Sequence, residues 1–127
     1  MRYLTLLCVI TLGLSGCTTL ADARKAEGDG IKKEYPVTVQ RAWDASKNAL
    51  SKLKLEVASE NPQQGYMLAQ RGITAFSYGE NVAIFIRKKS ETTSTIEVVS
   101  KKSMTTNIFA PDWSEDIHKE IALDIRR

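Results

Sequence analysis

Hydrophobic and polar residues alternate along residues 81–89 and again along residues 94–101. A two-residue period is the pattern of a β-strand whose two faces meet different surroundings. In the first run, Val82, Ile84 and Ile86 are predicted to point to one face of the sheet, and the residues between them to the other. A short polar turn separates the two runs, so they are predicted to pair as an antiparallel hairpin. Shorter apolar runs predict further strands at residues 32–37, 55–58 and 66–71.

Two other segments repeat their hydrophobic residues every three or four positions, which predicts amphipathic helices. The first covers residues 39–53, and Thr38 is placed to cap its N-terminus. The second begins near Asp112, which has capping-box spacing to Glu115, and its apolar residues fall at every fourth position from Trp113. The predicted order is β-α-β-β-β-β-α, with hairpin-length turns between the later strands. We therefore expect a two-layer α+β domain, in which two helices cover one face of an antiparallel sheet of about four to five strands.

The first sixteen residues differ from the rest of the chain. A positive start at Arg2 is followed by a mostly apolar run and two small residues, which is typical of a secretory signal peptide. The run is shorter than the ~20 apolar residues that a bilayer-spanning helix needs. It ends in Leu14-Ser15-Gly16-Cys17, which resembles the lipobox of bacterial lipoproteins. The resemblance implies lipid on the Cys17 thiol and cleavage between Gly16 and Cys17; the alternatives are an ordinary secreted protein or an uncleaved anchor.

The same reading divides the chain into a signal peptide (1–16), a lipidated cysteine with a flexible tether (17–31) and a single domain (32–127). The tether would reach at most ~45 Å from the membrane. Cys8 leaves with the signal peptide, so no thiol remains for a disulfide, a zinc site or a nucleophile. In the Gram-negative lipoproteins that this chain resembles, Asp after the lipidated cysteine favours retention in the inner membrane. Thr18 stands there instead, which favours the periplasmic face of the outer membrane.

Neither the net charge nor the candidate catalytic residues point to a specific function. The net charge of +3 falls to +2 when Arg2 is removed, so no nucleic-acid partner is expected. The basic clusters at residues 87–89 and 101–102 are predicted to lie ~15 Å apart on the hairpin, which keeps them from forming one patch. His118 is the only histidine, and a catalytic triad or histidine metal site would have to use it. We expect instead a surface or half-buried histidine, a solvated stripe of Asp116, Glu120 and Asp124, no catalytic residues, no metal and no cofactor apart from the lipid.

Two predicted connections, residues 72–80 and 103–111, are unusually rich in apolar residues. By the hairpin register both lie at one end of the sheet. They either fold back to close the core or form a site for a partner. The possible partner surface consists of Phe76, Tyr78, Ile108 and Phe109.

The region from Tyr35 to Arg71 is similar to several small lipoprotein domain families of unknown function. The matching residues are Tyr35, Trp43-Asp44-Ala45, Leu50 and Gly65-Tyr66. The resemblance implies a strand, a helix and a β-meander in that order. The function expected is a non-enzymatic binding or scaffold module for another envelope component, namely a protein. The alternatives are a carrier with a pocket for a small ligand or lipid between sheet and helices, and an envelope hydrolase using His118 or the Asp116/Glu120 pair.

Overall fold

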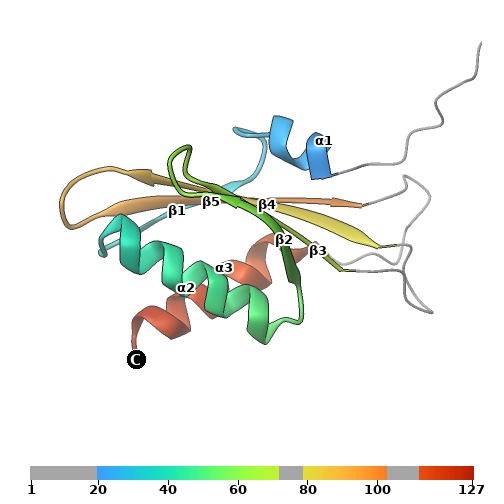
Figure 1. Cartoon of the computed structure of the whole chain (residues 1–127). Coiled ribbons are helices and arrows are strands. Elements are labelled where there is room, and N and C mark those ends of the chain that lie inside the picture. The colour runs from blue at the N-terminus through green and yellow to red at the C-terminus, as the bar shows by residue number, and fades with distance from the viewer. Residues whose placement is uncertain (1–19, 72–78, 103–111) are drawn as a thin grey trace, which may run out of the picture.

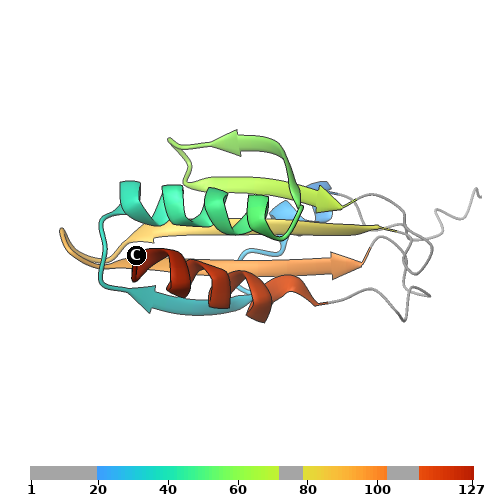
Figure 2. The ribbon, with the colours of Figure 1, turned by 90° about the horizontal axis from the view of Figure 1, so that it is seen from below.

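A computed structural model describes residues 20–71, 79–102 and 112–127. In the described residues, five strands form one antiparallel sheet in the order β1-β5-β4-β3-β2. Helices α2 and α3 lie side by side across one face, and a short helix, α1, lies on the other (Figures 1 and 2). The elements are α1 (Leu20–Lys25), β1 (Ile31–Tyr35), α2 (Val39–Lys52), β2 (Glu56–Asn61), β3 (Tyr66–Arg71), β4 (Glu80–Lys88), β5 (Ser94–Lys102) and α3 (Trp113–Ile125).

This architecture confirms the predicted α+β class, with two helices on one face of the sheet. Along β4, Val82, Ile84 and Ile86 belong to the core under α2 and α3, whereas Ala83 and Phe85 belong to a second cluster on the opposite face. The alternation in the sequence therefore assigned the faces correctly. The hairpin register differs from the expected one by one residue, because the turn closes with Lys89 and Ser90 both donating to the carbonyl of Thr93.

Helix α2 begins where the sequence predicts and ends one residue earlier. The Thr38 hydroxyl accepts a hydrogen bond from the Arg41 amide at 3.1 Å, which satisfies one of the free N–H groups of the first turn. At the other end Lys54 adopts a positive φ of 60°, a left-handed conformation that turns the chain back toward β2. The buried face of the helix contains three alanines, at positions 42, 45 and 49, which leaves room for the bulkier side chains of the sheet and α3.

Helix α3 is capped by Asp112, whose carboxylate accepts from the Ser114 amide at 2.9 Å. The reciprocal half of the predicted capping box belongs to Glu115, but its carboxylate bonds the Lys33 amine of β1 at 2.9 Å. Trp113, Ile117 and Ile121 pack into the core as the four-residue spacing predicts. Because a tertiary partner competes with the local one, the capping-box pattern located the helix start but not the Glu115 contact.

Strand β2 is longer than predicted and reaches Asn61. It pairs with β3 through a bulge between Val57 and Ser59, and the turn closes with the Gly65 amide donating to the Asn61 carbonyl at 2.8 Å. Gly65 has a positive φ of 73°, and a Cβ there would lie 2.6 Å from the Ile86 carbonyl oxygen, so glycine is required. Strand pairing thus extends into residues that the sequence assigns to the turn.

Helix α1 differs most from expectation, because residues 20–30 fall within the predicted flexible tether. Ala23 and Ala26 are 0% and 7% exposed. They pack on Leu68, Ala83, Phe85 and Val99, with Leu20 and Tyr66 at the margin. Residues 20–30 are therefore packed on the sheet where the sequence predicts a flexible tether, and they cover apolar residues on its second face. Cys17 and its neighbours through residue 19 lie outside the described residues.

None of the helices in the described ranges has both the length and the apolar character needed to cross a bilayer.

Candidate functional site

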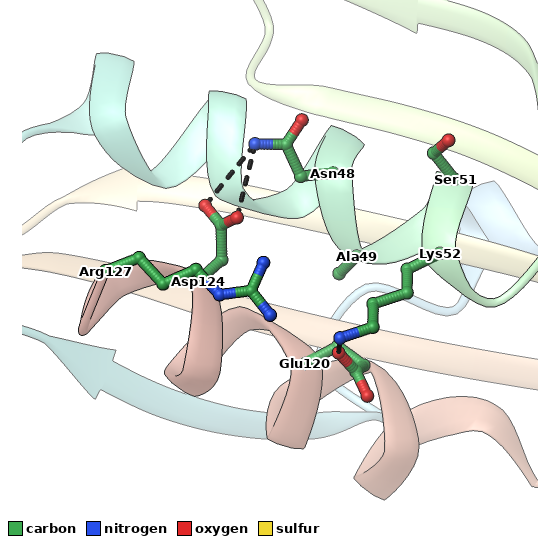
Figure 3. Close-up of a pocket in the computed structure, with 7 residues that line it drawn as sticks. All are labelled: Asn48, Ala49, Ser51, Lys52, Glu120, Asp124 and Arg127. Atoms are coloured by element: carbon green, nitrogen blue, oxygen red, sulfur yellow. Dashed lines mark hydrogen bonds and ion pairs between the residues drawn. The ribbon is translucent and has the colours of Figure 1, made fainter.

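A hollow of about 340 Å³ opens at the surface between α2 and α3 (Figure 3). Its walls come from the facing sides of the two helices and from the chain end after α3. Ala49 contributes only a methyl group, which leaves the space open. The lining residues are Asn48, Ala49, Ser51, Lys52, Glu120, Asp124 and Arg127.

The carboxylates of this groove are paired across the helix interface. The Lys52 amine lies 3.2 Å from Glu120. Arg41 donates to the Asp124 carboxylate at 2.8 Å and to the Asp124 backbone carbonyl at 2.7 Å, and the Asn48 amide adds a longer bond of 3.4 Å to each oxygen. The hydrogen bond from Arg41 lowers the pKa of Asp124, partial burial opposes it, and Asn48 adds to the lowering. Asp124 therefore stays ionised and is suited to an ion pair, not to proton donation.

This geometry corrects the expectation of one solvated acidic stripe on α3. Asp116 is exposed as predicted, but Glu120 and Asp124 are largely buried against α2. Each four-residue step rotates a side chain by about 40° around a helix of 3.6 residues per turn. The first step, from Asp116 to Glu120, already carries the stripe from solvent into the interface. In Figure 3 the Arg127 side chain also points into the groove, so both charge signs line it.

His118 is 1% exposed, which corrects the expected surface or half-buried position. Its Nε2 lies 2.7 Å from the Ile31 carbonyl oxygen of β1, and its Nδ1 lies 2.6 Å from the Tyr35 hydroxyl. A carbonyl can only accept, so Nε2 carries the proton, and Nδ1 must accept from Tyr35. The two rings stack with centroids 5.9 Å apart. With both ring nitrogens engaged, His118 joins α3 to β1 and is not oriented toward a metal or substrate.

Burial sets the protonation of this pair. Desolvation lowers the pKa of His118, partly opposed by the bond to Ile31. Burial, with a smaller contribution from the Glu115 charge, raises the pKa of Tyr35 to about 12. Both groups are therefore neutral at pH 7, as the geometry of the hydrogen bonds requires.

The basic residues at positions 87–89 are paired with nearby carboxylates. Arg87 contacts Glu27, and Lys89 contacts Glu34. Arg87 pairs with Thr95 in the β4–β5 ladder and Lys101 with Asn81, which places the two clusters six residues apart, or roughly 20 Å. The expected separation was smaller, and the structure keeps the clusters well apart.

The proposed partner surface, Phe76, Tyr78, Ile108 and Phe109, and the processing residues Gly16 and Cys17 lie outside the described residues. The ends of both connections are described. Arg71 pairs with Glu80, and Glu80 with Lys102, in one row across the sheet. The Arg71 guanidinium also lies 5.5 Å from the ring centroid of Trp113, the first residue of α3. Both connections therefore begin and end at one end of the sheet, as the register predicted (Figure 1).

Sequence reasoning missed a set of hydrogen bonds on the α1 face of the sheet, named here the Glu97 clasp. Glu97 of β5 is only 3% exposed. Its carboxylate accepts from the Gly28 amide at 2.8 and 3.0 Å and from the Gly30 amide at 2.9 Å. Gly28 and Gly30 read only as helix breakers in the sequence, and a polar residue in an alternating strand reads as solvent-facing. Glu97 and the two glycines are about 70 residues apart in the sequence, so no local sequence pattern predicts that they meet.

Comparison of the chain with protein-family models and with curated proteins finds no match in either case.

Proposed function

We propose that this chain is the precursor of a bacterial lipoprotein held to the membrane by lipid on Cys17, at the periplasmic face of the outer membrane. The tetrapeptide Leu14-Ser15-Gly16-Cys17 at the end of an apolar run supports the anchor. Thr18 supports the outer membrane, because Asp at this position favours inner-membrane retention in the lipoproteins that the chain resembles. Two or more acyl chains on one cysteine would hold the protein stably, because each buried methylene contributes ~0.8 kcal/mol.

The anchored domain, on this proposal, is a non-enzymatic module that binds another envelope protein. The site is the loop-end surface, defined here as Phe76, Tyr78, Ile108 and Phe109 in residues 72–80 and 103–111. The observation that carries the proposal is the row formed by Arg71, Glu80 and Lys102, which brings the bases of both aromatic-containing connections together. Aromatic side chains gathered on one rigid base are the usual anchors of protein interfaces.

The alternative of a small-ligand or lipid carrier requires an apolar pocket between the sheet and α2 and α3. In the parts of the chain that the structure describes, the groove between the two helices is lined by polar and charged side chains together with the Ala49 methyl group. The sheet side of α2 and α3 is a continuous cluster of buried apolar residues. No observation favours the carrier over the binding module.

A pull-down from detergent-solubilised envelope tests the binding module. The lipidated protein is compared with the double variant Phe76→Ala plus Phe109→Ala, and we expect the partner to be lost or bound at least ~10-fold more weakly, since interface aromatics often contribute ~2 kcal/mol or more. The matched control is Val57→Ala plus Leu123→Ala, because these are the exposed large hydrophobic residues elsewhere on the described surface, at 38% and 37%. An unchanged partner with the first variant, or equal loss with both, would contradict the loop-end surface.

The anchor is tested separately by the mass of the mature N-terminal peptide. Cells producing the wild-type chain should yield an acylated Cys17 peptide, and Cys17→Ser should yield an unprocessed or unacylated chain. A wild-type peptide cleaved elsewhere, or free of lipid, would contradict the lipoprotein assignment.

A further inference from the structure

Helix α1 has too few residues to be stable by itself. It spans six residues, Leu20–Lys25, whereas isolated helices shorter than ~12 residues are marginal in water. Its position therefore depends on the sheet beneath it. Ala23 and Ala26 are buried on that sheet, and the Arg24 guanidinium lies 4.1 Å from the ring centroid of Tyr66. The helix is docked by these contacts on the face opposite α2 and α3.

The chain that follows α1 is fastened as well. Glu97 accepts the amides of Gly28 and Gly30, and Arg87 pairs with Glu27 between them and the helix. Gly30 also fits closely, because a Cβ there would overlap the Val98 carbonyl. Residues 20–30 thus form a strap, named here the α1 strap, that is held at both its helical and its glycine-containing ends.

The α1 strap leaves only Thr18 and Thr19 between the docked helix and Cys17. Three consecutive Cα–Cα steps of 3.8 Å span at most about 11 Å. With the strap docked, the domain lies at most about 11 Å from the lipidated residue. A free tether would allow a distance of up to ~45 Å. Helix α1, which follows this connection in the sequence, lies on the face of the sheet opposite α2 and α3 (Figure 1).

We infer that the face carrying α1 is a docking surface for the lipid bilayer, so that α2, α3 and the groove between them face away from the membrane. This inference depends on the proposed lipidation of Cys17. The short connection and the two-point fastening of the α1 strap are what orient the domain. Several charges of this face are partnered within the protein, because Arg87 and Lys89 pair with Glu27 and Glu34, and Glu97 accepts from backbone amides.

The experiment uses the full lipidated chain in phosphatidylcholine vesicles that contain a lipid with a nitroxide headgroup. The mature chain has no free thiol once Cys17 is acylated, so Lys25→Cys on α1 and Leu123→Cys on α3 each accept one fluorophore. Both positions are exposed, and their helices, α1 and α3, lie on opposite sides of the sheet (Figure 1). We expect the nitroxide lipid to quench the label at residue 25 and to leave the label at residue 123 unquenched.

Release of the α1 strap should remove this difference. Ala23→Lys places a charge at a buried position of α1, and Ala21→Lys makes the same change at an exposed position of the same helix. The first should abolish the quenching difference and the second should preserve it. Gly30→Ala, which opens the other end of the strap, should act like Ala23→Lys, and thermal unfolding by circular dichroism verifies that each variant is folded.

Three results would overturn the inference. Equal quenching at residues 25 and 123 in protein whose Cys17 is acylated would remove the orientation and leave the proposed anchor standing. A quenching difference seen only when phosphatidylglycerol is added would assign the orientation to charge and not to the α1 strap. An unacylated Cys17 peptide in the same preparation would instead remove the proposed anchor.

Discussion

The two faces of the sheet are covered in physically different ways. Among the described residues, seventeen form one buried apolar cluster between the sheet and α2 and α3, and one of them, Tyr35, bonds the buried His118. On the α1 face the described cluster has six buried residues, and a carboxylate that binds two glycine amides adds to it. Hydrophobic burial scales with area, so the first face should determine whether the domain folds. The second determines where the N-terminal segment lies.

The largest effect should come from the α2/α3 face. Ile84→Ala removes a fully buried side chain at the centre of the sheet and should lower the free energy of unfolding by ~2–5 kcal/mol. Urea unfolding measures it, with Leu123→Ala as the exposed control, for which a change within about 0.5 kcal/mol is expected. A loss below 1 kcal/mol at Ile84 would mean that this face is not the main core.

Removal of the Tyr35 hydroxyl should have the next largest effect. Tyr35→Phe leaves the buried Nδ1 of His118 without its donor, at a cost of ~1–3 kcal/mol. Tyr66→Phe is the matched change on the opposite face, where the ring is only partly buried, and it should alter stability little. An equal decrease in the free energy of unfolding in both variants would show that the hydrogen bond from Tyr35 to His118 does not contribute specifically to stability.

The His118 pair also predicts how stability depends on pH. Because the folded-state pKa of His118 is lowered, the unfolded chain takes up a proton first as the pH falls. This contribution is fully present above an unfolded-state pKa of about 6.5 and declines below it, by at most about 1.4 kcal/mol per pH unit. Urea unfolding from pH 7.5 to 5.5 should show the decline in wild type, and less of it in His118→Gln. A flat wild-type profile would contradict a buried neutral histidine.

The smallest global effect should follow from the α1 face. Glu97→Gln keeps the shape of the side chain but removes the charge that the two glycine amides share, which should cost ~1 kcal/mol. Amide hydrogen exchange should accelerate at Gly28 and Gly30, while the amides of β4 beneath α2 keep their protection. Equal acceleration on both faces would mean that the α1 strap and the core unfold as one unit.

The elements that the sequence predicted well are those with a local period. The alternation in residues 81–101 assigned Val82, Ile84 and Ile86 to one face, and the four-residue spacing from Trp113 placed α3. The predictions fail where a residue distant in the sequence determines the contact or the end of an element. Glu115 had the spacing of a capping box, but Lys33 of β1 engages it, and β2 extends through pairing with β3.

The groove between α2 and α3 was also beyond sequence reasoning. Glu120 and Asp124 were recognised as one stripe with Asp116, but nothing local distinguishes a residue that meets Lys52 or Arg41 from one that meets water. The four partners come from helices more than 60 residues apart. Only the crossing of the helices brings them together, and it turns a predicted solvated face into an interface.

Sequence by itself determined the strands, the two long helices and their buried faces, because backbone geometry links a period of two or about four residues to one side of an element. It also supplied the lipobox on which the proposed anchor rests. Only the tertiary structure decided the burial of His118, the docking of α1 and the clasp formed by Glu97 with Gly28 and Gly30. These depend on contacts between distant segments, whose free energy comes from desolvation and hydrogen bonding that exist only once the sheet has formed.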